Sequence, residues 1–115
     1  MLLKVDHSSS QALHDQLAGQ LRAAIAAGEV KPGERLAPAR ELAAGLDVNV
    51  HTVLRALKTL KAERLVDMRR GRGTVVTGIA PKMASLSELA EKLVVEARRS
   101  GLERHEIIEL VEAKL

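Results

Sequence analysis

The chain has 115 residues, of which 46% are hydrophobic and none is Phe, Tyr or Trp, and its formal net charge is +3. This length suits one domain with a short appendage, which excludes a multidomain enzyme, and the lack of aromatic rings argues against modules that stack single-stranded bases. The chain contains no cysteine for disulfides or thiolate zinc sites, and no apolar signal core or membrane-length run, so we expect a soluble cytoplasmic protein without a membrane partner.

The first expected helix lies between Ser10, its predicted N-cap, and Gly28. Residues 2–5 before it are expected to form a short edge strand. The segment from Gly28 to Pro38 contains two Gly and two Pro, so it is predicted to be a connector, with Leu36 as its one apolar anchor. The apolar face of the helix, at three- and four-residue spacing, comprises Leu13, Leu17, Leu21, Ala24 and Ile25.

Two further helices follow the connector with the spacing of a helix-turn-helix motif. One is expected from about Pro38 to Leu46, since proline suits the first turn of a helix. The next is expected to start at Asn49, a favourable N-cap residue. Its predicted buried stripe consists of Val53, Ala56, Leu57 and Leu60.

A basic β-hairpin is expected after these helices. The β-prone stretches Leu65–Arg69 and Thr74–Thr77 flank the sequence Arg70-Gly71-Arg72-Gly73, which is typical of a tight hairpin, that is, a wing. Residues 55–72 contain seven basic and two acidic residues, whereas residues 79–115 contain six basic and seven acidic residues. The first of these segments is therefore expected to bind a polyanion.

The tail is predicted to contain two amphipathic helices after a hinge at residues 78–84. Ser85 and Glu88 form a potential capping box for the first helix, and Leu102 and Ile107 a hydrophobic staple for the second, which begins near Arg104. Two such helices cannot bury both apolar faces alone, so they are expected to form a homodimer interface; packing onto the first helix is the alternative. The candidate interface residues are Leu89, Leu93, Val94, Ile107, Ile108 and Val111.

The candidate binding face lies on the third helix, opposite its buried stripe. A helical projection places His51, Arg55 and Lys58 there, with Thr52 and Thr59 on its flank, and such a helix fits the major groove of B-DNA. The hairpin residues Arg70–Gly73 are expected to contact a minor groove or the phosphate backbone. Either feature alone is typical of an ordinary solvated surface, but their order along the chain favours contact with double-stranded DNA.

Several stretches of the sequence resemble the GntR regulators, and residues 48–56 resemble the turn and recognition helix of the YtrA subfamily. The resemblance covers residues 2–78 and implies that DNA-contacting positions are occupied by Arg40, Asn49, Thr52, Arg55 and Arg70–Gly73. Val50 and His51 replace the usual Pro and Asn, and Arg64 replaces a common Gly. The matching stretches are Leu13-His-Asp-Gln-Leu17, Gly28-Glu-Val-Lys-Pro-Gly-Glu-Arg-Leu36, Arg40-Glu-Leu-Ala43 and Arg69-Arg-Gly-Arg-Gly-Thr-Val-Val76.

We therefore expect a mainly α fold with a small β wing: a winged helix-turn-helix DNA-binding domain over residues 1–78 and a helical dimerisation tail over residues 79–115. The expected function is sequence-specific binding of an inverted-repeat operator by a homodimeric repressor. No enzyme activity, cofactor or metal is expected, and the sequence identifies no effector. The alternative is a winged-helix adaptor that binds proteins, whose basic patch serves solubility alone.

Overall fold

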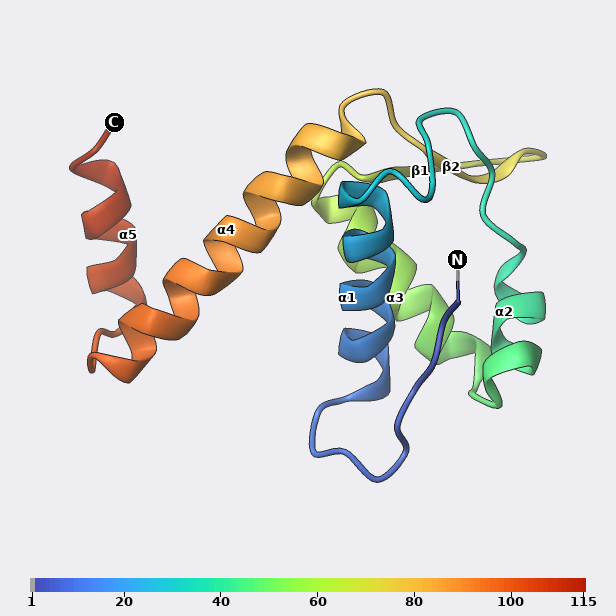
Figure 1. The fold of residues 1–115 in the computed structure, drawn as a ribbon, viewed down its shortest axis with the longest axis horizontal. Coiled ribbons are helices and arrows are strands. Elements are labelled where there is room, and N and C mark those ends of the chain that lie inside the picture. The colour runs from blue at the N-terminus through green and yellow to red at the C-terminus, as the bar shows by residue number, and fades with distance from the viewer. Residues whose placement is uncertain (1) are drawn as a thin grey trace. The chain divides into compact units, whose positions relative to one another are not determined.

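A computed structural model describes residues 2–115, which divide into a first unit ending at Ser85 and a second unit, Leu86–Leu115 (Figure 1). The first unit contains α1 (Leu13–Ala26), α2 (Ala39–Leu46), α3 (Val50–Ala62), β1 (Val66–Arg69) and β2 (Gly73–Val76). Helix α4 (Ala80–Arg99) begins in the first unit and continues into the second, which also contains α5 (Arg104–Glu112). The predicted fold class, mainly helical with a small two-stranded sheet, is confirmed.

The core of the first unit is aliphatic, and α3 packs on both α1 and α2. The predicted apolar stripe of α3 is confirmed, because all four of its residues are buried. In α1, Leu13 stays partly exposed while Ala18 joins the buried face. The buried residues of these two helices are Leu17, Ala18, Leu21, Ala24 and Ile25 in α1, and Val53, Ala56, Leu57 and Leu60 in α3.

Helices α1 to α4 all end in the same hydrogen-bonded motif, in which one residue takes a left-handed conformation. After α3, Leu65 N–H donates to Leu60 carbonyl over 2.9 Å and Arg64 N–H to Lys61 carbonyl over 3.0 Å. This is the Schellman pattern, for which glycine is the preferred left-handed residue. Gly28 and Gly101 supply it after α1 and α4, whereas Asp47 (φ 54°) and Arg64 (φ 65°) supply it after α2 and α3.

The hairpin is tied to the connector that precedes α2. Strands β1 and β2 pair antiparallel, with Val66 opposite Val76 and Arg69 opposite Gly73. The connector runs along the other edge of β2: Gly33 N–H donates to Val76 carbonyl over 2.8 Å, and Leu36 N–H to Thr74 carbonyl over 2.9 Å. Leu36 is buried as predicted, but Val30 is a second buried anchor that the prediction did not include.

The prediction of an edge strand at residues 2–5 is wrong. Two glutamine side chains of α1 hold this arm instead: Gln20 Oε1 accepts from Lys4 N–H over 2.9 Å and Gln16 Oε1 accepts from Asp6 N–H over 2.8 Å. The Ser8 hydroxyl and N–H both donate to the Asp6 carboxylate, which lowers the pKa of Asp6. Ser10 is not the N-cap of α1, because Ala12 occupies that position.

The predicted hinge at residues 78–84 is also wrong over most of its length, because α4 begins at Ala80 and is continuous. Pro81 lies in its first turn, where a missing N–H costs no helical hydrogen bond. Ser85 is therefore an interior residue and not an N-cap, and its hydroxyl donates to Pro81 carbonyl over 3.1 Å. Ala80 and Ala84 are buried in the core of the first unit.

The second unit is a hairpin of the C-terminal part of α4 and α5. Glu103 is the N-cap of α5, and its N–H donates to Glu106 Oε1 over 3.0 Å in a capping box. Leu102 and Ile107 occupy the two positions of the predicted staple, and Ile107 is buried. Helix α5 ends at Glu112. No helix within residues 2–115 is both long and apolar enough to cross a membrane.

Candidate nucleic-acid interface

The start of α3 is fixed by its N-cap. Asn49 Oδ1 accepts from His51 N–H over 2.8 Å, as the sequence predicts. This bond satisfies one of the N–H groups that a helix leaves free at its first turn, and it leaves the side-chain amide nitrogen of Asn49 available to donate. Asn49 therefore lies where it can both start the helix and bind a partner.

The exposed side of α3 carries the predicted basic residues. His51, Arg55 and Lys58 are all exposed, while the adjoining Val53 and Leu57 are buried. Thr52 and Thr59 lie on the flank and are half-buried. The Thr59 hydroxyl donates to Arg55 carbonyl over 3.2 Å within the helix. The three basic residues are thus presented to a partner by a helix whose opposite side is anchored in the core.

The far end of α3 is tied to α1 by a bidentate ion pair. Arg22 Nε donates to Glu63 Oε1 over 2.8 Å, and Arg22 Nη2 to Glu63 Oε2 over 2.7 Å. Both side chains are mostly buried, at 18% and 21% exposed, so solvent screens this pair less than a fully exposed one. The pair adds a directional contact to the apolar packing that holds α3.

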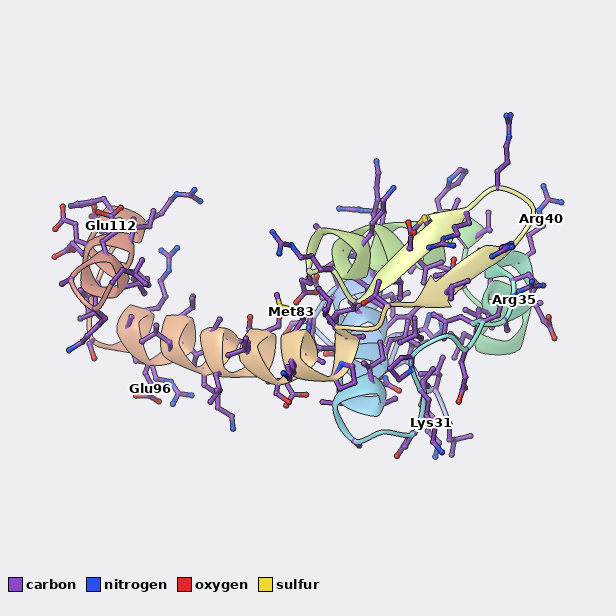
Figure 2. All side chains as sticks on the ribbon, turned by 90° about the horizontal axis from the view of Figure 1, so that it is seen from above. Lys31, Arg35, Arg40, Met83, Glu96 and Glu112 are labelled. Carbon is purple, nitrogen blue, oxygen red and sulfur yellow. The ribbon has the colours of Figure 1, made fainter. Side chains whose placement is uncertain are left out.

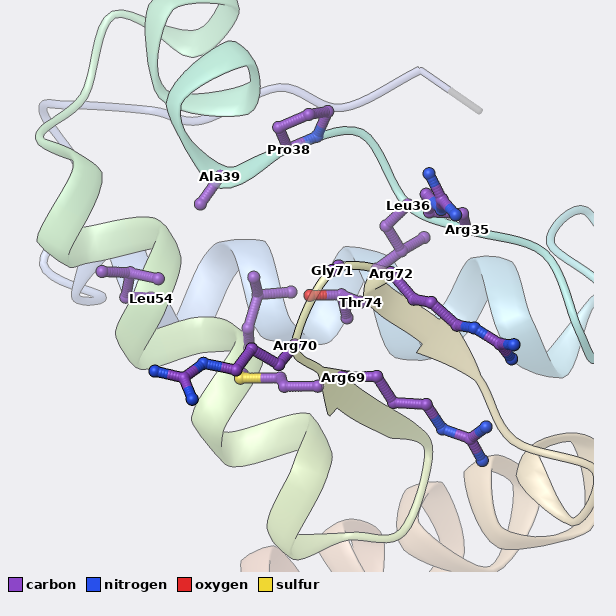
Figure 3. Close-up of a pocket in the computed structure, with 13 residues that line it drawn as sticks. Arg35, Leu36, Pro38, Ala39, Leu54, Arg69, Arg70, Gly71, Arg72 and Thr74 are labelled. Carbon is purple, nitrogen blue, oxygen red and sulfur yellow. The ribbon is translucent and has the colours of Figure 1, made fainter.

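The wing turns tightly at Arg70–Arg72, where Arg72 N–H donates to Arg69 carbonyl over 3.0 Å. Gly71 (φ 78°) and Gly73 (φ 72°) take left-handed conformations that a side chain would disfavour. Figure 3 shows the Arg70 side chain extending toward α3, whereas Arg69 and Arg72 extend the opposite way. Arg69 is paired there with Asp67 over 3.0 Å. The wing therefore presents cations on both of its sides.

A groove of about 680 Å³ lies between α3, the start of α2 and the wing (Figure 3). Arg70 and Arg72 border it from the wing and Arg35 from the connector, while Leu54 and Met68 line it with apolar atoms. A neighbouring hollow of about 530 Å³ is lined by His51, Leu54, Arg55, Lys58 and Met68. The structure thus brings the basic side of α3 and the tip of the wing to one continuous surface.

Arg40 lies in the first turn of α2, and it is exposed. Figure 2 shows Arg35 and Arg40 at the end of the first unit that carries α2 and the wing. Pro38 precedes this helix and provides no side-chain cap, so the first N–H groups of α2 remain available beside the Arg40 guanidinium. This end of α2 is a second positive feature next to the groove.

Sequence reasoning missed the groove residues Arg35, Leu54 and Met68. Leu54 was detectable, since it follows His51 by three residues and precedes Lys58 by four, which places it on the same helical side. The exposed side of α3 therefore carries an apolar residue that the prediction did not include. Arg35 and Met68 carried no signal, because their place follows from the pairing of the connector with β2 and of β2 with β1.

The second unit exposes apolar side chains that a stable monomer normally buries. Of the predicted interface residues only Ile107 is buried; Leu89 is 60% exposed, and the remaining four are between 38% and 44% exposed. Leu86, Leu110 and Val95 add to this apolar surface. Such a concentration of exposed apolar side chains is typical of an interaction surface.

A helix-turn-helix whose second helix exposes a basic side, next to a basic hairpin, defines a winged-helix DNA-binding regulator. Residues 13–76 match the model of the bacterial regulatory proteins of the gntR family. The chain therefore belongs to the GntR family, as its sequence motifs predicted. It is a DNA-binding transcription regulator and not an enzyme.

Relatives of similar length align with most of this chain. The HTH-type transcriptional repressor YtrA of Bacillus subtilis (strain 168) is 30% identical over 116 residues, which cover 96% of this chain and 89% of that protein. The HTH-type transcriptional regulator Rv1152 of Mycobacterium tuberculosis is 36% identical over 87% of this chain and 83% of its own. YtrA from Sulfolobus acidocaldarius, a GntR-family transcription factor, aligns with a TM-score of 0.63 at 29% identity, covering 96% and 94% of the two chains. The resemblance to YtrA-like regulators is confirmed.

Proposed function

We propose that the protein is a repressor that binds an inverted-repeat operator as a homodimer and blocks access of the polymerase. The observation that carries this proposal is the continuous surface formed by the exposed side of α3 and the tip of the wing. Repression is supported by the relative from Bacillus subtilis, which is itself named a transcriptional repressor. Because the operator lies on the chromosome, we expect the protein to act in the cytoplasm.

Base readout is assigned to α3 in the major groove. Arg55 is exposed near the middle of this helix, and an arginine there is suited to bind guanine O6 and N7 with two hydrogen bonds. His51 and Thr52 lie one turn earlier, where the N-terminal part of a recognition helix approaches base edges. Lys58 lies one turn later and is assigned to a phosphate or a flanking base.

Contacts to the DNA backbone are assigned to the wing and to the first turn of α2. Arg70 and Arg72 extend to different sides of the hairpin, so they are suited to phosphates of different strands or to a phosphate and the adjacent minor groove. Gly71 and Gly73 keep the tip narrow enough for close approach. Two further contacts to the DNA backbone are assigned to Arg40, beside the free N–H groups of α2, and to the side-chain amide of Asn49.

Dimerisation is assigned to the tail. Within the predicted tail of residues 79–115, the exposed apolar side chains concentrate in the hairpin of residues 86–115. A second copy of the same hairpin is the simplest cover, since a two-fold axis makes one surface complementary to itself. A two-fold dimer would bind half-sites about one helical turn apart, which is about 34 Å along the duplex.

The rival function is a protein-binding adaptor, for which the apolar atoms of Leu54 and Met68 in the groove are the one favourable observation. The basic residues around them favour DNA instead. A selection experiment decides between DNA binding and protein binding. The full chain selects duplexes from a random library, and the selected duplexes are then footprinted. We expect two protected segments related by two-fold symmetry. A library that yields no preferred sequence would exclude operator recognition.

A further inference from the structure

Leu54 is an apolar residue in the middle of the basic side of α3. His51, Leu54 and Lys58 follow one another at three- and four-residue spacing, so they share one helical side with Arg55. The Leu54 side chain is 41% exposed. Within residues 2–115, it belongs neither to the buried core nor to the partly buried residues packed against that core. The packing of the fold therefore gives no reason for a leucine here.

Leu54 and Met68 together form an apolar strip that faces the groove. Met68 lies on β1, is half-buried and packs against the core, so its position is fixed. Both residues line the groove beside the wing and the hollow beside Arg55. Figure 3 shows Leu54 on α3 at one side of this groove and Arg70 extending toward it from the wing.

The chemistry around the strip indicates what covers it. His51, Arg55 and Lys58 surround it on α3, and Arg70 borders it from the wing. An apolar protein surface would have to desolvate these basic side chains without partners, whereas the major groove of DNA pairs them with phosphates and base acceptors. The one apolar group that an unmodified base presents in that groove is the C5-methyl of thymine.

We infer that Leu54 is a specificity-determining residue that contacts the C5-methyl group of one thymine in each operator half-site. The inference rests on the proposed binding of α3 in the major groove. It adds to the hydrogen bonds of Arg55 an apolar contact that distinguishes thymine from cytosine at a neighbouring base pair. Met68, which lines the same groove and packs against the core, adds apolar surface beside this contact.

The test removes only the methyl group. The full chain selects its operator from random duplexes, and each thymine of one half-site is then replaced by deoxyuridine, which keeps every hydrogen bond. Burial of one methyl corresponds to about a fourfold change in affinity. We expect one replacement to weaken binding by about this factor in the wild type and to have no effect in Leu54→Ala. Leu54→Met, which keeps an apolar side chain, should retain the sensitivity.

Two controls separate this contact from general loss of binding. Lys58→Ala should weaken binding to the thymine and deoxyuridine duplexes equally, so that their ratio stays at about four. Leu54→Ala should melt at the wild-type temperature, because the side chain is outside the core. If no replacement matters, or if the sensitivity survives in Leu54→Ala, the inference is overturned while the operator binding stands. If the wild type selects no sequence, the proposed function itself fails and the inference with it.

Discussion

Arg64 holds a left-handed conformation at φ 65°, and its neighbours require it there. The Thr77 hydroxyl donates to Arg64 carbonyl over 2.7 Å, and Leu65 N–H closes the end of α3. A side chain with a β-carbon disfavours this conformation by about 1 to 2 kcal/mol, although glycine loses more backbone entropy on folding. The end of α3 is therefore suboptimal in this chain.

Arg64→Gly should stabilise the protein by about 1 kcal/mol, which raises the melting temperature by about 4 °C. Thermal unfolding, monitored by circular dichroism, measures the change in melting temperature. Lys61→Gly is the matched control: Lys61 is an exposed basic residue inside α3, so glycine there should lower the melting temperature. A decrease for Arg64→Gly would show that its side chain makes a stabilising contact that outweighs the backbone strain.

Arg55 and Arg72 are assigned different roles, which their alanine variants should separate. Arg55→Ala should cost about 1 to 3 kcal/mol of binding free energy and relax one operator position, because a base contact is lost. Arg72→Ala should weaken binding to all operator variants evenly. It should also lower the slope of log affinity against log salt concentration by about one, because one phosphate contact is lost. Affinities for a panel of single-base operator variants measure both. Equal, sequence-independent losses would contradict the assignment of Arg55.

At the scale of elements, Asn49 caps the start of α3 and is proposed also to contact the operator. Asn49→Ala removes the cap and should destabilise the fold by about 1 kcal/mol. Asn49→Asp keeps a capping oxygen but replaces the amide donor by a negative charge, so it should melt like the wild type and bind the operator more weakly. Asn49→Ser, which caps without a charge, separates donor loss from repulsion. Full affinity of Asn49→Asp would restrict Asn49 to capping.

The elements whose boundaries depend on local signals were predictable from the sequence. The stripe of α3, the cap at Asn49 and the glycine hairpin each follow from neighbouring residues. The N-terminal arm and the start of α4 were predicted wrongly because tertiary contacts override the local signals there. Ser85 and Glu88 form a capping pattern, yet burial of Ala80 and Ala84 in the core of the first unit extends α4 backwards through it. Likewise, Gln16 and Gln20 hold the N-terminal arm, so it forms no strand.

The site was predictable in part for the same reason. Helical spacing places His51, Arg55 and Lys58 on one side, and the same spacing includes Leu54. The groove itself depends on the pairing of Arg35 with Val75 and on the position of Met68. Arg35 and Val75 are 40 residues apart in the sequence, so no local pattern reports their contact.

At the scale of the whole molecule, the exposed apolar hairpin predicts a dimer. Leu89→Glu and Val111→Glu place charges on this surface and should yield a species with the mass of one chain, whereas the wild type should show twice that mass in light scattering. Lys92→Glu, an exposed charge reversal on α4, is the control and should stay dimeric. The monomeric variants should lose operator affinity, since each chain then binds one half-site. A monomeric wild type would contradict the dimer.

The dependence of operator affinity on salt tests the central claim most directly, that α3 and the wing together bind duplex DNA. Fluorescence anisotropy with a labelled operator gives the affinity between about 50 and 200 mM salt. Contacts to about 6 to 10 phosphates per dimer predict a loss of about a thousandfold or more over this range. An affinity that stays constant with salt, or no binding to any duplex, would contradict the account.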